Sequence, residues 1–182
     1  SAGATAKTMT MKGSSMINNG SIVCSNFNID STATISGTGS WSPYTILGIG
    51  ANGNVTLMSD VNFSPGSGLT VTSGGILNPN GYNINYSSGT FTLNSGATVV
   101  NSGLFKTQNT VNINVRAGSF FNVPLKVLSG ITSAADYSSP RVGSLFGDVT
   151  VDSGATLSAT ESTNFSYNLQ FYGNLINNGT LS

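Results

Sequence analysis

A repeat of about twenty residues is the feature that most restricts how this chain can fold. When the sequence is written in rows of twenty, one column holds only apolar residues: Val71, Phe91, Val111, Ile131, Val151 and Phe171. Threonine and other polar residues dominate the two flanking columns. Alternate side chains of a β-strand face opposite ways. We therefore expect the apolar column to form one interior file and the flanking residues to face solvent.

This period suits one coil of a parallel β-solenoid. Propeller blades need about 40 residues each, and leucine-rich repeats need a denser leucine pattern. Twenty residues hold two or three short strands, whose backbone groups must pair with the coils above and below. We predict an all-β solenoid domain of about nine coils over residues 11–182, with uncapped ends. Residues 1–10 are expected to form an N-terminal arm. Residues 37–53 and 137–148 are expected to form loops outside the coils or longer coil sides.

Charged residues offer a check on this register. Lys106 and Lys126 are twenty residues apart, and so are Arg116 and Asp136. A coil of twenty residues places the members of each pair about 5 Å apart at the backbone. We expect Arg116 and Asp136 to attract, whereas either the two lysines point away from each other into water or the register slips there.

Composition excludes several functional classes. Six basic and six acidic residues cancel, only 7% of residues are charged, and histidine is absent. A chain without a basic patch is not expected to bind nucleic acid. Without histidine and with one cysteine, we expect no zinc site, haem site, catalytic Ser-His-Asp triad or other cofactor. The sequence has no apolar run long enough for a transmembrane helix, so we expect no membrane insertion.

The two ends of the chain carry the same phrase. Residues 16–22 read MINNGSI, and residues 175–181 read LINNGTL. No amphipathic helix flanks either phrase, so both ends of the solenoid are expected to expose unpaired backbone groups. Contact between the unlike ends of identical copies does not close and builds an open filament. The residues expected at this subunit interface are Met11, Met16, Ile17, Asn18, Asn19, Ile22, Leu175, Ile176, Asn177, Asn178 and Leu181.

Two phrases resemble the repeats of a known class of extracellular proteins. VDSGATL at residues 151–157 and GNLINNGTL at residues 173–181 are similar to repeats of filamentous-haemagglutinin-like adhesins and autotransporter passenger regions. The likeness covers about residues 11–36 and 54–182. It implies a right-handed parallel β-helix on or outside a cell, and it implies no particular binding or catalytic residue. Those adhesins are far longer than this chain.

These observations favour a secreted structural protein without enzymatic activity, which forms a head-to-tail homopolymer. The alternative is a cell-surface adhesin stalk or glycan-binding segment. In that alternative, Trp41 and Tyr44 contact a surface glycan or a neighbouring filament. The competing structural role for these two aromatic residues is to cap one end of the core.

The sequence suggests two further functions, and its single cysteine has two possible roles. An ice-binding array is suggested by Thr70, Thr72, Thr90, Thr92, Thr110, Thr132 and Thr150, although other residues interrupt it. A polysaccharide-cleaving enzyme would need paired carboxylates, for which Asp148 and Asp152 are the candidates. Ordinary turn and strand positions account better for both acids. Cys24 is expected in the core, with an intermolecular disulfide as the alternative.

Overall fold

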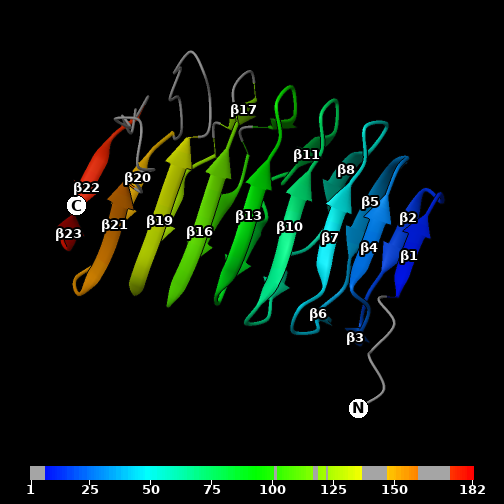
Figure 1. Ribbon diagram of the computed structural model, residues 1–182, viewed down its shortest axis with the longest axis horizontal. Helices are drawn as coiled ribbons and strands as arrows, with labels where there is room; N and C mark the ends of the chain where they lie inside the picture. Colours follow the sequence, from blue (N-terminus) through cyan, green and yellow to red (C-terminus); the bar gives the residue numbers. More distant parts are fainter. Residues whose placement is uncertain (1–6, 101, 117–118, 122, 137–146, 160–172) are drawn as a thin grey trace.

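The computed structural model of the protein describes residues 7–100, 102–116, 119–121, 123–136, 147–159 and 173–182. All regular structure in these residues is β-strand, arranged in three sheets of parallel strands (Figure 1). Each coil contributes strands to successive sheets, so neighbouring strands of a sheet come from neighbouring coils. The predicted all-β parallel solenoid is confirmed.

Sheet A contains β1 (Thr8–Met11), β4 (Asn26–Ile29), β7 (Ile46–Ile49), β10 (Ser67–Val71), β13 (Gly89–Leu93), β16 (Thr110–Val115), β19 (Gly130–Asp136), β21 (Ala155–Ala159) and β23 (Thr180–Leu181). Sheet B contains β2 (Ser15–Ile17), β5 (Thr32–Ser36), β8 (Asn54–Leu57), β11 (Ile76–Asn78), β14 (Thr98–Val99) and β17 (Phe120–Phe121). Sheet C contains β3 (Ser21–Ile22), β6 (Ser40–Trp41), β9 (Val61–Phe63), β12 (Asn83–Tyr86), β15 (Leu104–Thr107), β18 (Leu125–Val127), β20 (Val149–Val151) and β22 (Leu175–Asn177).

The coil is right-handed and forms a rod. In Figure 1 the strands of sheet A rise in front, and the chain descends behind them while it advances from β1 toward β23. Within the described residues, six coils have strands in all three sheets, and two more have strands in sheets A and C only. The count is therefore slightly below the predicted nine.

The fixed period of twenty residues is wrong in detail. Residues that pair along sheet A are 18 apart for Thr8 and Asn26, 22 apart for Ser67 and Gly89, and 25 apart for Gly130 and Ala155. The corners between strands differ in length, and each added corner residue shifts the register of the next coil. The expected single interior file consequently does not exist. Its described members are scattered, since Val71 lies beside Leu93, Phe91 beside Leu69, Val111 beside Thr132, Ile131 on the exposed face and Val151 in sheet C.

The core is built instead around a continuous series of aromatic rings. Ring centroids are 6.1 Å apart for Trp41 and Phe63, 4.6 Å for Phe63 and Tyr86, and 5.3 Å for Tyr86 and Phe105. All three pairs are stacked, and all four side chains are buried. Aromatic pairs at such distances add to the stability gained from burial alone. The series therefore ties four consecutive coils together through their interiors.

Residues 37–53 form regular coil, which agrees with the alternative of longer coil sides and not with a loop outside the coils. They contain β6 and β7, whose residues pair with the coils on both sides. The glycine-rich composition misled the prediction, because these glycines serve tight corners and close contacts between coils. The first strand, β1, begins at Thr8, inside the segment expected to be an arm. Most of the second expected loop, at 137–148, lies outside the described residues.

The lysine register is as expected, whereas the Arg116 register is shifted. Lys106 and Lys126 lie opposite each other in β15 and β18. The Lys126 ammonium lies 3.3 Å from an Asp152 carboxylate oxygen, which offsets the repulsion between the two lysines. Asp136 lies opposite Val115 rather than Arg116, one residue away from the predicted position.

Three carboxylates join adjacent coils at their corners. The backbone N–H of an asparagine in the next coil donates to each carboxylate, at 3.0 Å for Asp30 and Asn52, 2.8 Å for Asp60 and Asn83, and 2.8 Å for Asp148 and Asn174. The asparagine side-chain amide donates to the same carboxylate in every case. Hydrogen bonds to a charged acceptor are among the stronger ones in proteins. We call these three Asp–Asn pairs the corner clamps.

The corner clamp at Asp60 predicts a loss of stability in acid. Partial burial acts to raise the pKa of Asp60, but hydrogen bonds from Asn83 and the nearby Lys106 charge outweigh it, so the pKa lies below its ordinary value. A carboxylate with a lowered folded-state pKa stabilises the fold above its unfolded pKa of about 3.9, and this contribution disappears as pH falls through the folded-state value. We expect Asp60→Asn to cost about 1 kcal/mol at pH 7 and much less at pH 2. Urea unfolding of both proteins at the two pH values measures this, and an equal difference at both would contradict it.

Candidate assembly interface at the ends of the solenoid

Three apolar side chains at the N-terminal end face the core, and no described coil lies above them. Each lies beside a buried residue of the following coil: Met11 beside Ile29, Met16 beside Ile35, and Ile22 beside Trp41. All three pack against the core but remain partly exposed. The first coil thus leaves its apolar interior open to solvent within the described residues.

The C-terminal end has a matching opening. Leu175 lies beside the buried Val149, and Leu181 lies beside the buried Leu157, so both leucines face the core. Their exposed fractions are nevertheless 41% and 42%, because no described residue covers them. A leucine on an inward column is ordinarily covered by the next coil. The last layer of this core is therefore incomplete in the part of the chain that is described.

The end strands also carry unpaired edges. Among the described strands, β1, β2 and β3 pair only with β4, β5 and β6, while β22 and β23 pair only with β20 and β21. An exposed strand edge with unpaired backbone groups is a template for pairing with another chain. Apolar surface and unpaired edges thus coincide at both ends.

The remaining predicted interface residues also lie in the end coils, and most of them are at corners or on outer faces. Ile17 and Ile176 point outward and are 73% and 54% exposed. Asn19 accepts the Thr38 backbone N–H at 3.3 Å, and Asn178 is exposed. Asn177 lies beside Val151 on the inward side of β22. All eleven predicted residues therefore lie in the two end coils.

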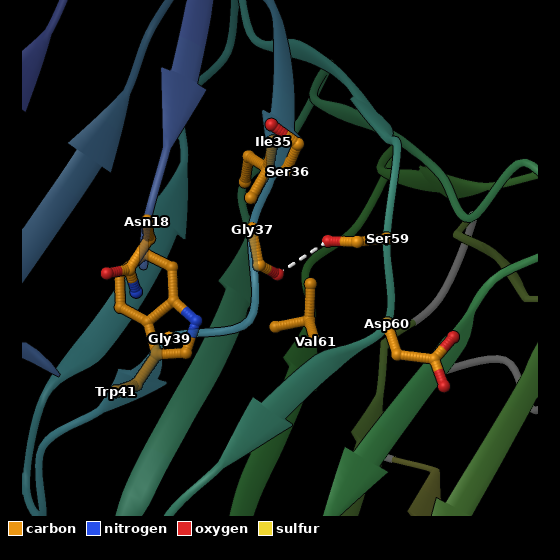
Figure 2. Close-up of a pocket in the computed structure, with 9 residues that line it drawn as sticks. All are labelled: Asn18, Ile35, Ser36, Gly37, Gly39, Trp41, Ser59, Asp60 and Val61. Carbon is orange, nitrogen blue, oxygen red and sulfur yellow. Dashed lines mark hydrogen bonds between the residues drawn. The ribbon is translucent and has the colours of Figure 1, made fainter. Parts of the chain in front are cut away.

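Asn18 forms a tight corner between the first two coils (Figure 2). Its side-chain amide donates to the Ser40 carbonyl at 3.3 Å, and its backbone carbonyl leaves no room for a Cβ at Gly37, whose φ of 104° also favours glycine. The Ser59 hydroxyl donates to the Gly37 carbonyl at 2.8 Å from the third coil. The gap among these residues has a volume of about 10 Å³. This is far below the volume of roughly 300–1,000 Å³ typical of small-molecule sites, so the corner is a structural joint.

The two candidate contact residues, Trp41 and Tyr44, occupy opposite environments. Trp41 is 2% exposed and packs between Phe27 and Phe63, so its indole belongs to the core. Tyr44 is 80% exposed and has a positive φ of 69° in the turn before β7. Of the two, only Tyr44 presents its ring to a molecule in solution.

A shallow groove lies on the outer face of sheet C. Its volume is about 270 Å³, and it is lined by Asn62, Phe63, Asn85, Tyr86, Ser87, Lys106 and Gln108. The Asn85 side-chain amide donates to Asn62 Oδ1 at 2.8 Å, so the asparagines form a short ladder along the groove. The rings of Phe63 and Tyr86 are buried on the core side of the sheet, so the polar side chains shape the open surface of the groove. The sequence analysis did not identify this groove.

The two candidate carboxylates and the threonine array do not form the expected arrangements. Asp148 belongs to a corner clamp, and Asp152 pairs with Lys126. Of the seven threonines, only Thr70 and Thr92 lie opposite each other. Thr132 faces the core, where its hydroxyl lies 2.7 Å from that of Thr107. The shifted coil lengths separate the threonines that a constant period would align.

Other site classes have no candidate in the described part of the chain. No group of three or more cysteine, aspartate or glutamate side chains is placed there to hold a metal ion. The same residues include no helix of the length and apolar character needed to cross a membrane. Cys24 is buried, which raises the pKa of its thiol.

Comparisons with protein-family models, curated proteins and solved structures find no match to this chain.

Proposed function

We propose that this protein is the structural subunit of an extracellular filament and assembles head to tail by stacking of its solenoid ends. The observation that carries the proposal is the inward-facing but exposed pair Leu175 and Leu181 at one end, opposite partly exposed Met11, Met16 and Ile22 at the other. Stacking would bury these side chains and pair the open strand edges in one step. The ends are unlike, so each junction leaves a free end for the next copy.

The composition supports the close packing of copies in this proposal, and the repeat phrases support its extracellular setting. A formal net charge of zero, with 7% charged residues, leaves little repulsion against close packing of copies. The likeness of residues 151–157 and 173–181 to adhesin repeats favours a secreted or cell-surface protein.

Light scattering over a range of protein concentrations tests the proposal. We expect the average mass to rise with concentration, and negative-stain electron micrographs to show unbranched rods of constant width. A particle mass that stays at 18.6 kDa across the range would contradict head-to-tail assembly.

A second candidate function is glycan binding on the side of the rod, as in an adhesin stalk. The polar groove on sheet C favours it, since its side chains present amide and ammonium groups next to one another: Asn62, Asn85, Lys106 and Gln108. Such groups suit hydroxyl-rich ligands. A glycan array probed with the protein and with Gln108→Ala tests this function. Binding that is lost in the variant would support it, and an array without signal would contradict it.

A further inference from the structure

We propose that successive copies in this filament are rotated by one side of the three-sided coil, so that residues 16–22 of one copy lie directly over residues 175–181 of the preceding copy. This inference rests on the proposed head-to-tail assembly and specifies its junction. It follows from three observations: the sheets that the two phrases occupy, their common corner geometry, and the hydrogen-bonding phase of their open edges.

The two phrases occupy different sides of the solenoid. At the N-terminal end, β2 lies in sheet B and β3 in sheet C, so MINNGSI turns the corner from B to C. At the C-terminal end, β22 lies in sheet C and β23 in sheet A, so LINNGTL turns the corner from C to A. Without rotation, β3 would meet β22, and residues 23–25 would lie over the corner at Asn178 and Gly179. With a rotation by one side, the two like corners coincide.

The like corners share the same local hydrogen bond. In the first phrase, the Gly20 backbone N–H donates to Asn18 Oδ1 at 3.1 Å. In the second, the Gly179 backbone N–H donates to Asn177 Oδ1 at 3.1 Å. Each turn follows a three-residue strand and precedes a two-residue strand. Two corners that share this hydrogen bond and similar flanking strands are suited to stack on each other.

The residues whose backbone groups point to the open edge of β22 are the ones that pairing with β2 requires. Alternate residues of a parallel strand direct their backbone groups to the same neighbour. The Asn178 backbone N–H donates to the Val151 carbonyl, and the Asn174 carbonyl accepts from the Val149 backbone N–H, both within the molecule. The groups of Leu175 and Asn177 therefore lie on the open edge.

The open edge of β2 has the complementary phase. The Asn18 backbone N–H donates to the Ser36 carbonyl, and the Ser14 carbonyl accepts from the Thr34 backbone N–H, again within the molecule. The backbone groups of Ser15 and Ile17 therefore lie on its open edge. With Met16 opposite Leu175, both edges can pair as in an ordinary parallel sheet. The next strands, β23 and β3, agree with this register. The Ser182 backbone N–H donates to the Leu157 carbonyl and the Ser42 backbone N–H donates to the Ile22 carbonyl, both within the molecule. Leu181 of one copy is therefore placed opposite Ile22 of the next.

The side chains match in this register as well. Inward-facing Met16 meets inward-facing Leu175, and inward-facing Ile22 meets inward-facing Leu181. Outward-facing Ile17 lies over outward-facing Ile176, which covers the two most exposed aliphatic side chains of the two phrases. Every apolar residue of one phrase thus finds an apolar partner in the other.

Cross-linking between differently substituted copies tests the rotation. Cysteine variants are made in a Cys24→Ala background, and fluorescent maleimide labelling first confirms that each new thiol is accessible. Ile176→Cys protein is mixed with Ile17→Cys protein or with Ser21→Cys protein, and a short bifunctional maleimide is added. We expect a cross-linked dimer from the first mixture and its loss in the second, because rotation places Ile17, not Ser21, over Ile176.

The other outcomes separate the rotation from the assembly itself. Cross-linking in the second mixture alone, or in neither mixture while light scattering shows polymers, overturns the rotated junction but leaves head-to-tail assembly intact. Particles that remain monomeric in the Cys24→Ala background and in the unsubstituted protein overturn the proposed function. Each single variant incubated alone serves as the matched control and is expected to give no dimer.

Discussion

The double variant Leu175→Lys and Leu181→Lys is expected to remain a folded monomer at concentrations where the unsubstituted protein forms filaments. Both leucines face the core but are 41% and 42% exposed, so lysine can reach solvent there without entering a packed interior. In a filament, the same two positions would be covered by the next copy, and two unpaired charges would be buried at each junction. Burying an unpaired charge costs several kcal/mol. Sedimentation or light scattering measures the loss of polymer.

The control for this prediction is Ile131→Lys. Ile131 is 49% exposed on the outer face of β19, away from both ends, so the variant changes the net charge without altering a junction. We expect it to polymerise as the unsubstituted protein does. Circular dichroism must show the same β-sheet signal for all three proteins. Filaments formed by the double lysine variant would contradict stacking through the leucine end.

Phe63→Ala is expected to cause the largest loss of stability of any single substitution discussed for this chain. Phe63 is 2% exposed and stacks between Trp41 and Tyr86, with centroid distances of 6.1 Å and 4.6 Å. Removing a buried phenylalanine side chain costs about 3–5 kcal/mol, because it combines lost burial with a cavity. Coils that contact only their neighbours cannot close such a cavity from farther along the rod. Urea unfolding followed by tyrosine and tryptophan fluorescence measures the change.

Tyr44→Ala provides the matched aromatic control for Phe63→Ala. The Tyr44 side chain is 80% exposed, so its removal is expected to change the free energy of unfolding by no more than about 0.5 kcal/mol. Equal effects of the two substitutions would show that the aromatic series does not stabilise the core. The unfolding of a solenoid need not be two-state, so the comparison uses shifts of the transition midpoint in both proteins.

The solenoid could be predicted from the sequence because alternation and glycine corners recur in every coil. Its register could not, because coils of 18 to 26 residues do not keep a constant period. A fixed spacing of twenty aligned Val71 with Phe91, whereas the structure aligns Val71 with Leu93. The aromatic series was missed for the same reason, since Trp41, Phe63 and Tyr86 follow intervals of 22 and 23 residues.

The end residues were predictable in a way that the side groove was not. The repeated phrase at residues 16–22 and 175–181 is visible in the sequence, and the structure places both copies in the end coils. The groove at Asn85 and Gln108 depends on which side chains from different coils become neighbours, and that follows from corner lengths. The corner clamps have a weak sequence signal, since an asparagine follows each aspartate by 22 to 26 residues.

Coils that touch only the coils beside them give the rod a gradient of protection from solvent. A terminal coil can fray while the middle stays closed, because its opening breaks hydrogen bonds with one neighbour rather than two. Amide hydrogen exchange should therefore be fastest in β1–β3 and β22–β23 and slowest near β10–β13. Within a long fibre almost every terminal coil lies under another copy, so fraying is confined to the two tips. A fibre built this way would resist proteases in proportion to its length.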